Sequence, residues 1–274
     1  QLRRRLEAGD GPARRRRDLG LQVDALHARV GQLLGRTLTF EDELQRLFGV
    51  TMLPGEPSRR RAVLAELDRL LPGKGTLAAR LAAFDLRFVV PVARLPDVLE
   101  QAVAGCRAAT LAHVDLPAGE SVAIEYVTGE PWSAFSQYLG GYRSVLRINT
   151  GFPLTVDRVL ALACHEAYPG HHTSNSLRER ELVERRGLHE LSVQPLFSPV
   201  AFTAEALASA AASVAFPLEQ RLAFERDVLF PLAGLDRSDA ARSLRISALV
   251  QELEPGIASI AREYLERRTS SPEA

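Results

Sequence analysis

The chain has 274 residues, and 46% of them are hydrophobic, which is enough for one large domain or two smaller ones with a real core. Its 34 basic and 34 acidic side chains balance, so the whole molecule has no net charge to attract nucleic acid or an anionic membrane. No apolar run approaches the roughly 20 residues that cross a bilayer. We therefore expect no nucleic-acid partner and no membrane partner, and any partner has to be argued from a site.

The chain holds 2 cysteines, Cys106 and Cys164, which are too few for a disulfide framework. Cys164 falls within a helical apolar pattern, where a free buried thiol is common. We expect both thiols to be free in a reducing compartment, and hence a cytoplasmic protein. The arginine run at 14–17 is expected to be solvated, and we assign it no function.

The first part of the chain predicts a helical scaffold over residues 1–94. Apolar residues recur there at helical spacing between glycine and proline breaks. The expected helices cover residues 18–34, 39–48, 57–71 and 76–84. The remaining residues, 95–274, are predicted to form a second region, in one compact unit with the scaffold.

A further helix is expected after Pro96, which suits a first helical turn, and it should end before Pro117. The composition then changes. Residues 121–128 and 142–149 alternate and are rich in β-branched and aromatic side chains, which predicts two strands. Residues 129–141 between them are rich in glycine and carry Pro131 and Trp132. We therefore expect an antiparallel pair joined by a long loop.

The last part of the chain returns to helices. Thr155 is a candidate N-cap for a helix that leads into His165 and Glu166. Pro169 and Gly170 interrupt this helix. The further helices are expected at residues 173–186, 200–216, 218–229 and 238–267.

Four chemistry-bearing residues, His165, Glu166, His171 and His172, lie within eight positions, in a chain that has 6 histidines. Many zinc peptidases use the spacing His-Glu-x-x-His, in which two imidazoles bind zinc and the glutamate activates water. Here Pro169 occupies the place of the second histidine. A regular helix would put His172 about 20° from the face of His165, and His171 about 120° from it. A break at Gly170 can return His171 to the metal, so either histidine can be the second ligand.

The string HEAYPGHH resembles the His-Glu-x-x-Pro-Gly-His signature of the DUF885 family of bacterial proteins, which is similar to gluzincin-type zinc metallopeptidases. The resemblance extends over PAGESVAIEYVTGEPWS, YLGGYRSVLRINTGFPL and PLFSPVAFTAEALASAAASVAFP. It implies a mainly α, metallopeptidase-like fold with a small antiparallel β element next to the metal-binding helix. It also implies that His171 rather than His172 binds the metal, and that Glu205 is a further ligand. Ala206 departs from the glycine that usually follows this glutamate.

The residues around Glu205 point the same way, because residues 200–216 contain no other charge. An unpaired buried carboxylate is costly, so it should find a cation or become protonated. His165, His171 and Glu205 would provide three ligands for one zinc ion per chain. That set leaves a position open for water, as in catalytic zinc sites.

The expected function is zinc-dependent hydrolysis of a peptide or a small amide. Glu166 would act as general base, and Tyr142 or Arg143 would stabilise the developing oxyanion. Two alternatives remain. Two histidines and one carboxylate also form the metal site of non-haem iron oxidoreductases, and a non-catalytic helical module can retain a structural metal. The sequence does not indicate an oligomeric state.

Overall fold

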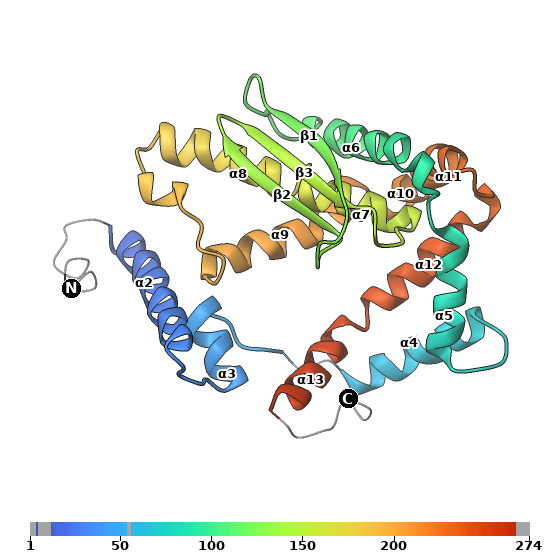
Figure 1. Ribbon diagram of the computed structural model, residues 1–274, viewed down its shortest axis with the longest axis horizontal. Helices are drawn as coiled ribbons and strands as arrows, with labels where there is room; N and C mark the ends of the chain where they lie inside the picture. The colour runs from blue at the N-terminus through green and yellow to red at the C-terminus, as the bar shows by residue number, and fades with distance from the viewer. Residues whose placement is uncertain (1–3, 5–11, 54–55, 267–274) are drawn as a thin grey trace. The chain divides into compact units, whose positions relative to one another are not determined.

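The structure is a computed structural model that describes residue 4 and residues 12–53 and 56–266. It is mainly helical and carries one three-stranded sheet (Figure 1), which confirms the predicted balance of helix and strand. The contacts divide the chain into two compact units. Unit 1 comprises residues 1–61, 193–205 and 252–274, and unit 2 comprises residues 62–192 and 206–251. The division at residues 94 and 95 stays a prediction, while these contacts place residues 62–94 with the region that contains the histidines.

Unit 1 is built from helices, of which α2 is the longest. Helix α2 begins at Ala13, so it includes the arginine run that we expected to precede it. Thr39 caps α3 by accepting a hydrogen bond from the Asp42 amide at 3.1 Å. Phe48 packs against the rings of Phe197 and Phe202, with centroids 6.5 and 6.1 Å away. The helical elements of this unit are α2 (Ala13–Leu33), α3 (Phe40–Glu43), the π-helix η1 (Leu44–Phe48) and α13 (Glu254–Leu265).

Unit 2 holds the sheet and most of the helices. Helices α4 and α9 begin in the residues of unit 1 and end in those of unit 2. The α-helices are α4 (Pro57–Leu70), α5 (Leu77–Asp85), α6 (Leu95–Leu111), α7 (Val156–Glu166), α8 (His171–Arg178), α9 (Pro199–Ala215), α10 (Leu218–Phe224), α11 (Phe230–Ala233) and α12 (Ala240–Gln251). The 3-10 and π segments are η2 (Leu86–Phe88), η3 (Val92–Arg94), η4 (Glu179–Glu184), η5 (His189–Ser192), η6 (Glu225–Leu229) and η7 (Arg237–Asp239).

Helix α6 packs along α7, and this pair forms the centre of unit 2. Leu99 on α6 and Leu160 on α7 are buried to 1% and 0% exposure, and a fully buried leucine side chain contributes roughly 2 kcal/mol. The same two helices are joined covalently, because Cys106 and Cys164 form a disulfide. The prediction of two free thiols was wrong. The two cysteines are buried and face each other from α6 and α7. They are 58 positions apart in the sequence, and the sequence alone does not indicate that they are close in space.

The sheet has the order β1-β3-β2, and its strands are β1 (Ser121–Val127), β2 (Ala134–Gly140) and β3 (Arg143–Asn149). Both predicted strands exist, but they pair in parallel rather than antiparallel. The segment expected to be their loop contains β2, which pairs with β3 antiparallel. The side chains of β2 alternate in exposure, as in a half-buried strand. The mixed composition of this short edge strand gives only a weak strand signal in the sequence, so a loop was predicted there. In Figure 1, α7 and α8 lie behind the sheet, and both contact β2.

The C-terminal helix predicted over residues 238–267 is divided in two. Helix α12 ends at Gln251, and α13 begins at Glu254 with Pro255 in its first turn, where a missing amide donor costs nothing. None of the described helices is by itself long and apolar enough to cross a membrane. One pair, Pro199–Ala215 with Leu218–Ala233, passes that test together by length and composition, with a bend of 75° between the two parts.

An ion pair is buried where α10 continues into η6. Arg221 Nε donates to Glu225 Oε1 at 2.7 Å, and the two side chains are 10% and 0% exposed. Burial outweighs the attraction of Arg221 and raises the pKa of Glu225 to about 7. Arg221 Nη2 and Glu225 Oε2 are buried without a hydrogen-bond partner, so the pair is incompletely satisfied.

Candidate metal centre

The site is built where α7 stops and α8 begins. Helix α7 is anchored by buried residues such as Val159 and Ala163 and ends at Glu166. The chain then reverses locally: the Gly170 amide donates to the Cys164 carbonyl at 3.0 Å, and the Thr173 amide donates to the Ala167 carbonyl at 3.2 Å. These bonds tie the first turn of α8 back onto the last turn of α7.

Gly170 is required for this close return of the chain. A Cβ atom at this position would lie 1.8 Å from the His165 carbonyl oxygen and 2.4 Å from that of Cys164. Both atoms belong to the backbone and cannot move aside as a flexible side chain would. Only glycine fits at this position. Pro169 and Gly170, which lie between the two helices, are called the joint below.

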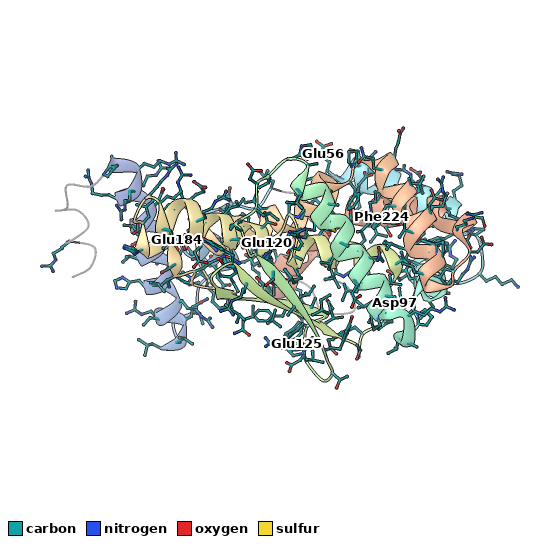
Figure 2. All side chains as sticks on the ribbon, turned by 90° about the horizontal axis from the view of Figure 1, so that it is seen from above. Glu56, Asp97, Glu120, Glu125, Glu184 and Phe224 are labelled. Carbon is teal, nitrogen blue, oxygen red and sulfur yellow. A yellow bond between two sulfur atoms is a disulfide. The ribbon has the colours of Figure 1, made fainter. Side chains whose placement is uncertain are left out.

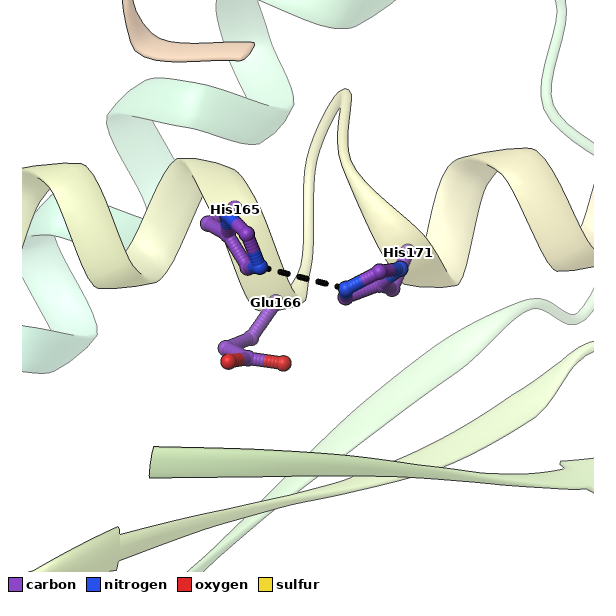
Figure 3. A group of neighbouring side chains, drawn as sticks. All are labelled: His165, Glu166 and His171. Atoms are coloured by element: carbon purple, nitrogen blue, oxygen red, sulfur yellow. Dashed lines mark hydrogen bonds between the residues drawn. The ribbon is translucent and has the colours of Figure 1, made fainter. Parts of the chain in front are cut away.

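The joint brings His165 and His171 together. Their Nε2 atoms lie 3.2 Å apart, and their rings meet edge to face with centroids 4.7 Å apart. Figure 3 shows the two imidazoles pointing at each other across the break, one from each helix. Of the two histidines left open by regular helix geometry, the structure thus brings His171, and not His172, to His165.

Glu166 lies beside this pair and is 7% exposed. Its carboxylate points from the end of α7 toward the sheet (Figure 3). Among the residues that the structure describes, one ligand atom from each of His165, Glu166 and His171 falls within 4.8 Å of the others. The group therefore combines two imidazoles and a carboxylate at the spacing of a metal site.

The donor set fits zinc in type and in distance. Zinc binds imidazole nitrogen at about 2.0–2.1 Å with tetrahedral angles, which places two such nitrogens about 3.3 Å apart. The observed separation of 3.2 Å between the Nε2 atoms agrees with that value. Both rings are partly exposed, so the pair is accessible from solvent.

His172 has a different role, and both of its ring nitrogens are engaged. The ring is completely buried, with Nδ1 2.7 Å from Ser144 Oγ on β3 and Nε2 2.9 Å from Glu120 Oε2. Since a carboxylate only accepts, the neutral ring donates from Nε2, and Nδ1 accepts from the serine hydroxyl. Burial lowers the pKa of His172, against the opposing effect of Glu120, which favours this neutral form. These contacts leave His172 no nitrogen for a metal.

Glu120, just before β1, is a site residue that the sequence analysis missed. Its side chain is only 2% exposed and accepts hydrogen bonds from His172, Tyr168 and Arg107. Arg107 on α6 donates from Nε at 2.8 Å and from Nη2 at 2.6 Å. Burial would raise the pKa of Glu120, but the three donors together hold it below its usual range. In the sequence, Glu120 is an acid at the start of a strand, which is a common surface pattern.

Glu205, the third ligand expected from the sequence, lies on α9 among the residues of unit 1, whereas the histidine pair lies in unit 2. The ligand role of Glu205 stays a prediction. The argument from composition assumed a buried carboxylate, whereas the Glu205 side chain is exposed. The cause is the composition of α9, whose buried positions are alanines such as Ala204 and Ala208.

Of the two candidate oxyanion donors, Tyr142 lies in the turn between β2 and β3, and Arg143 begins β3. Tyr142 has a left-handed backbone, with φ of 61°, and its hydroxyl donates to Glu184 in η4. Glu184 is the last residue of η4, the π-helix that continues α8. Arg143 is exposed at the first position of β3. Neither residue belongs to the histidine group, and the oxyanion role of both stays a prediction.

Comparison of the chain with family models, with curated proteins and with solved structures found no match.

Proposed function

We propose that the chain is a metal-dependent hydrolase that uses one zinc ion, held by His165 and His171, to cleave a peptide or a small amide. The observation that carries this proposal is the Nε2–Nε2 separation of 3.2 Å, reached through a joint that only glycine can form. The likeness of HEAYPGHH to the DUF885 signature supports the same reaction class. Glu205 is the proposed third protein ligand.

The chain's own residues supply the rest of the chemistry. Glu166, next to the histidine pair, would take a proton from the attacking water and pass it to the leaving amine. When bound, zinc lowers the pKa of a coordinated water to about 7 and polarises the substrate carbonyl. The Glu166 side chain is 7% exposed, so the proposed base lies largely out of contact with bulk solvent. Tyr142 and Arg143 remain the proposed oxyanion donors.

A second function has one observation in its favour. If Glu166 is itself a ligand, the group of His165, Glu166 and His171 has the two-histidine, one-carboxylate composition of non-haem iron oxidoreductases. A structural metal in a non-catalytic module would need closed coordination. The partial exposure of both histidines favours the catalytic alternatives over that one.

Metal analysis tests the proposal directly. Wild-type protein should contain about one zinc per chain, as in single-site zinc enzymes. His165→Ala, His171→Ala and Glu205→Ala should lose it, while Glu125→Gln, on the exposed face of β1, should keep it. Iron in place of zinc would favour the oxidoreductase. No metal in any sample after incubation with zinc would reject a metal site, and zinc kept by Glu205→Ala would reject that ligand alone.

A further inference from the structure

One carboxylate, Glu120, touches the chain on both sides of the joint between α7 and α8. Its Oε2 atom accepts from the Tyr168 hydroxyl, before the joint, and lies 2.9 Å from His172 Nε2, after it. Tyr168 itself is 2% exposed, and its ring meets that of His172 edge to face with centroids 5.0 Å apart. Glu120 therefore closes a bridge over the joint that brings the two zinc-binding candidates together.

The bridge is fixed from outside by two further elements. Arg107 on α6 holds Oε1 of Glu120 through two hydrogen bonds, and Ser144 on β3 holds the other nitrogen of His172. Arg107 follows Cys106, which is bonded to Cys164, the residue directly before His165. Helix α6 is thus bonded to α7 through the disulfide, and Arg107 on the same helix holds Glu120 in place. Figure 2 labels Glu120, which lies beside the sheet.

The chemistry of the bridge requires a carboxylate. It accepts from a phenol, an imidazole and a guanidinium at once, and an amide has one acceptor oxygen for these three donors. Removing the acceptor would leave a buried tyrosine hydroxyl, a fully buried imidazole and an arginine without their partner. The strain would fall on residues 168–172, where the position of His171 is determined.

This arrangement differs from the support usually given to metal-binding histidines. A carboxylate commonly accepts a hydrogen bond from the ligating imidazole itself and orients that ring. Glu120 instead holds His172, the neighbour of His171, and Tyr168, which follows Glu166 by two positions. It acts on the ligand through the backbone of the joint.

We infer that Glu120 is a positioning residue for the zinc site: by holding Tyr168 and His172 together, it sets the separation of His165 and His171. The inference rests on the proposed zinc site. Glu120 itself touches neither the metal nor the substrate.

Zinc affinity and the spectrum of bound cobalt test the inference without recourse to activity. We would titrate Glu120→Gln and Glu120→Ala with zinc against a chromophoric chelator, and record the visible absorption of Co²⁺ in each. The matched control is Glu125→Gln, which removes an acid from the same strand region but only an exposed pair with Arg147. Circular dichroism and thermal unfolding would report the fold of each variant.

We expect zinc affinity to fall 10- to 100-fold in both Glu120 variants, as for other outer supports of metal sites. The cobalt bands should shift, because the angle between the two histidines changes, and a general loss of stability would not shift them. If the Glu120 variants do not fold, Tyr168→Phe is the test instead, because it removes one of the hydrogen bonds to Glu120. We expect a smaller loss of zinc affinity and a shift of the cobalt bands in the same direction. Wild-type affinity and an unchanged cobalt spectrum would overturn the inference and leave the zinc site standing. No binding by the wild type would overturn both.

Discussion

The imidazoles of His165 and His171 face each other at 3.2 Å although a helix break separates the two residues. Helix regularity plays no part in this contact. The pair depends on a backbone turn that brings the first turn of α8 against the last carbonyl groups of α7.

Gly170→Ala should destroy the metal site. The added Cβ would overlap the His165 carbonyl at 1.8 Å, so the joint has to open and the histidines separate. We expect loss of zinc binding and a markedly lower unfolding temperature. Gly20→Ala is the control, because its Cβ meets nothing within 4 Å and the helix α2 around it should gain slightly in stability. Normal zinc binding by Gly170→Ala would contradict the account of the joint.

Glu166→Gln should separate the hydrolase from the oxidoreductase. An amide of the same shape cannot take the proton from water, so hydrolysis should fall about 10²- to 10⁴-fold at unchanged metal content. The measurement is metal content beside turnover on a peptide library, with Glu125→Gln as control. A variant that loses its metal would indicate that Glu166 is a ligand, and one that retains full turnover would exclude it as the base.

Reduction of the Cys106–Cys164 disulfide should destabilise the chain. The bond closes a loop with a sequence separation of 58, and the chain-entropy relation gives up to about 4 kcal/mol of free energy of unfolding for such a loop. Urea unfolding with and without reductant measures the difference. The double variant Cys106→Ala with Cys164→Ala should be insensitive to reductant. An equal effect of reductant on wild type and variant would show that the bond does not form in solution.

The burial of Glu225 beside Arg221 should make the free energy of unfolding fall as pH rises from 4.5 to about 7. The pKa of Glu225 is about 7 when folded, against 4.5 for the ordinary side chain, so the folded state binds this proton more tightly. Its contribution is therefore complete below pH 4.5 and is lost as pH rises to about 7, by about 3 kcal/mol.

Glu225→Gln should remove this dependence, since the amide resembles the protonated acid. The measurement is the free energy of unfolding from pH 4.5 to 8 for wild type, Glu225→Gln and the exposed-site control Glu125→Gln. The difference between wild type and Glu225→Gln should change with pH as stated, while the control follows the wild type. A constant difference would place the titration of Glu225 outside this range.

Local patterns in the sequence predict most of the helices. Proline at a first turn marks the start of α6, and helical spacing of apolar residues leads α7 to its histidines. Thr155 does occupy the N-cap position of α7, but its hydroxyl donates to Asp157 Oδ1 and caps no amide. The choice of His171 came from the resemblance and from the freedom of Gly170, because regular geometry favoured His172.

What the sequence did not predict is long-range. The parallel pairing of β1 with β3 requires β2 to lie on the other side of β3, and β2 carries no strong strand signal. Glu120 meets His172 across 52 positions, and Cys106 meets Cys164 across 58. Each of these residues looks ordinary in its local context, and only tertiary packing brings it to its partner.

Two neighbouring residues of α6, Cys106 and Arg107, fasten the two sides of the joint, one by a covalent bond and one through Glu120. Amide protons in the facing parts of α6 and α7 should therefore exchange with solvent only when both helices open together. We therefore expect the end of α7 that carries His165 to be among the slowest-opening parts of unit 2. The exposed edge strand β2, which has no such fastening to α6, should open before it.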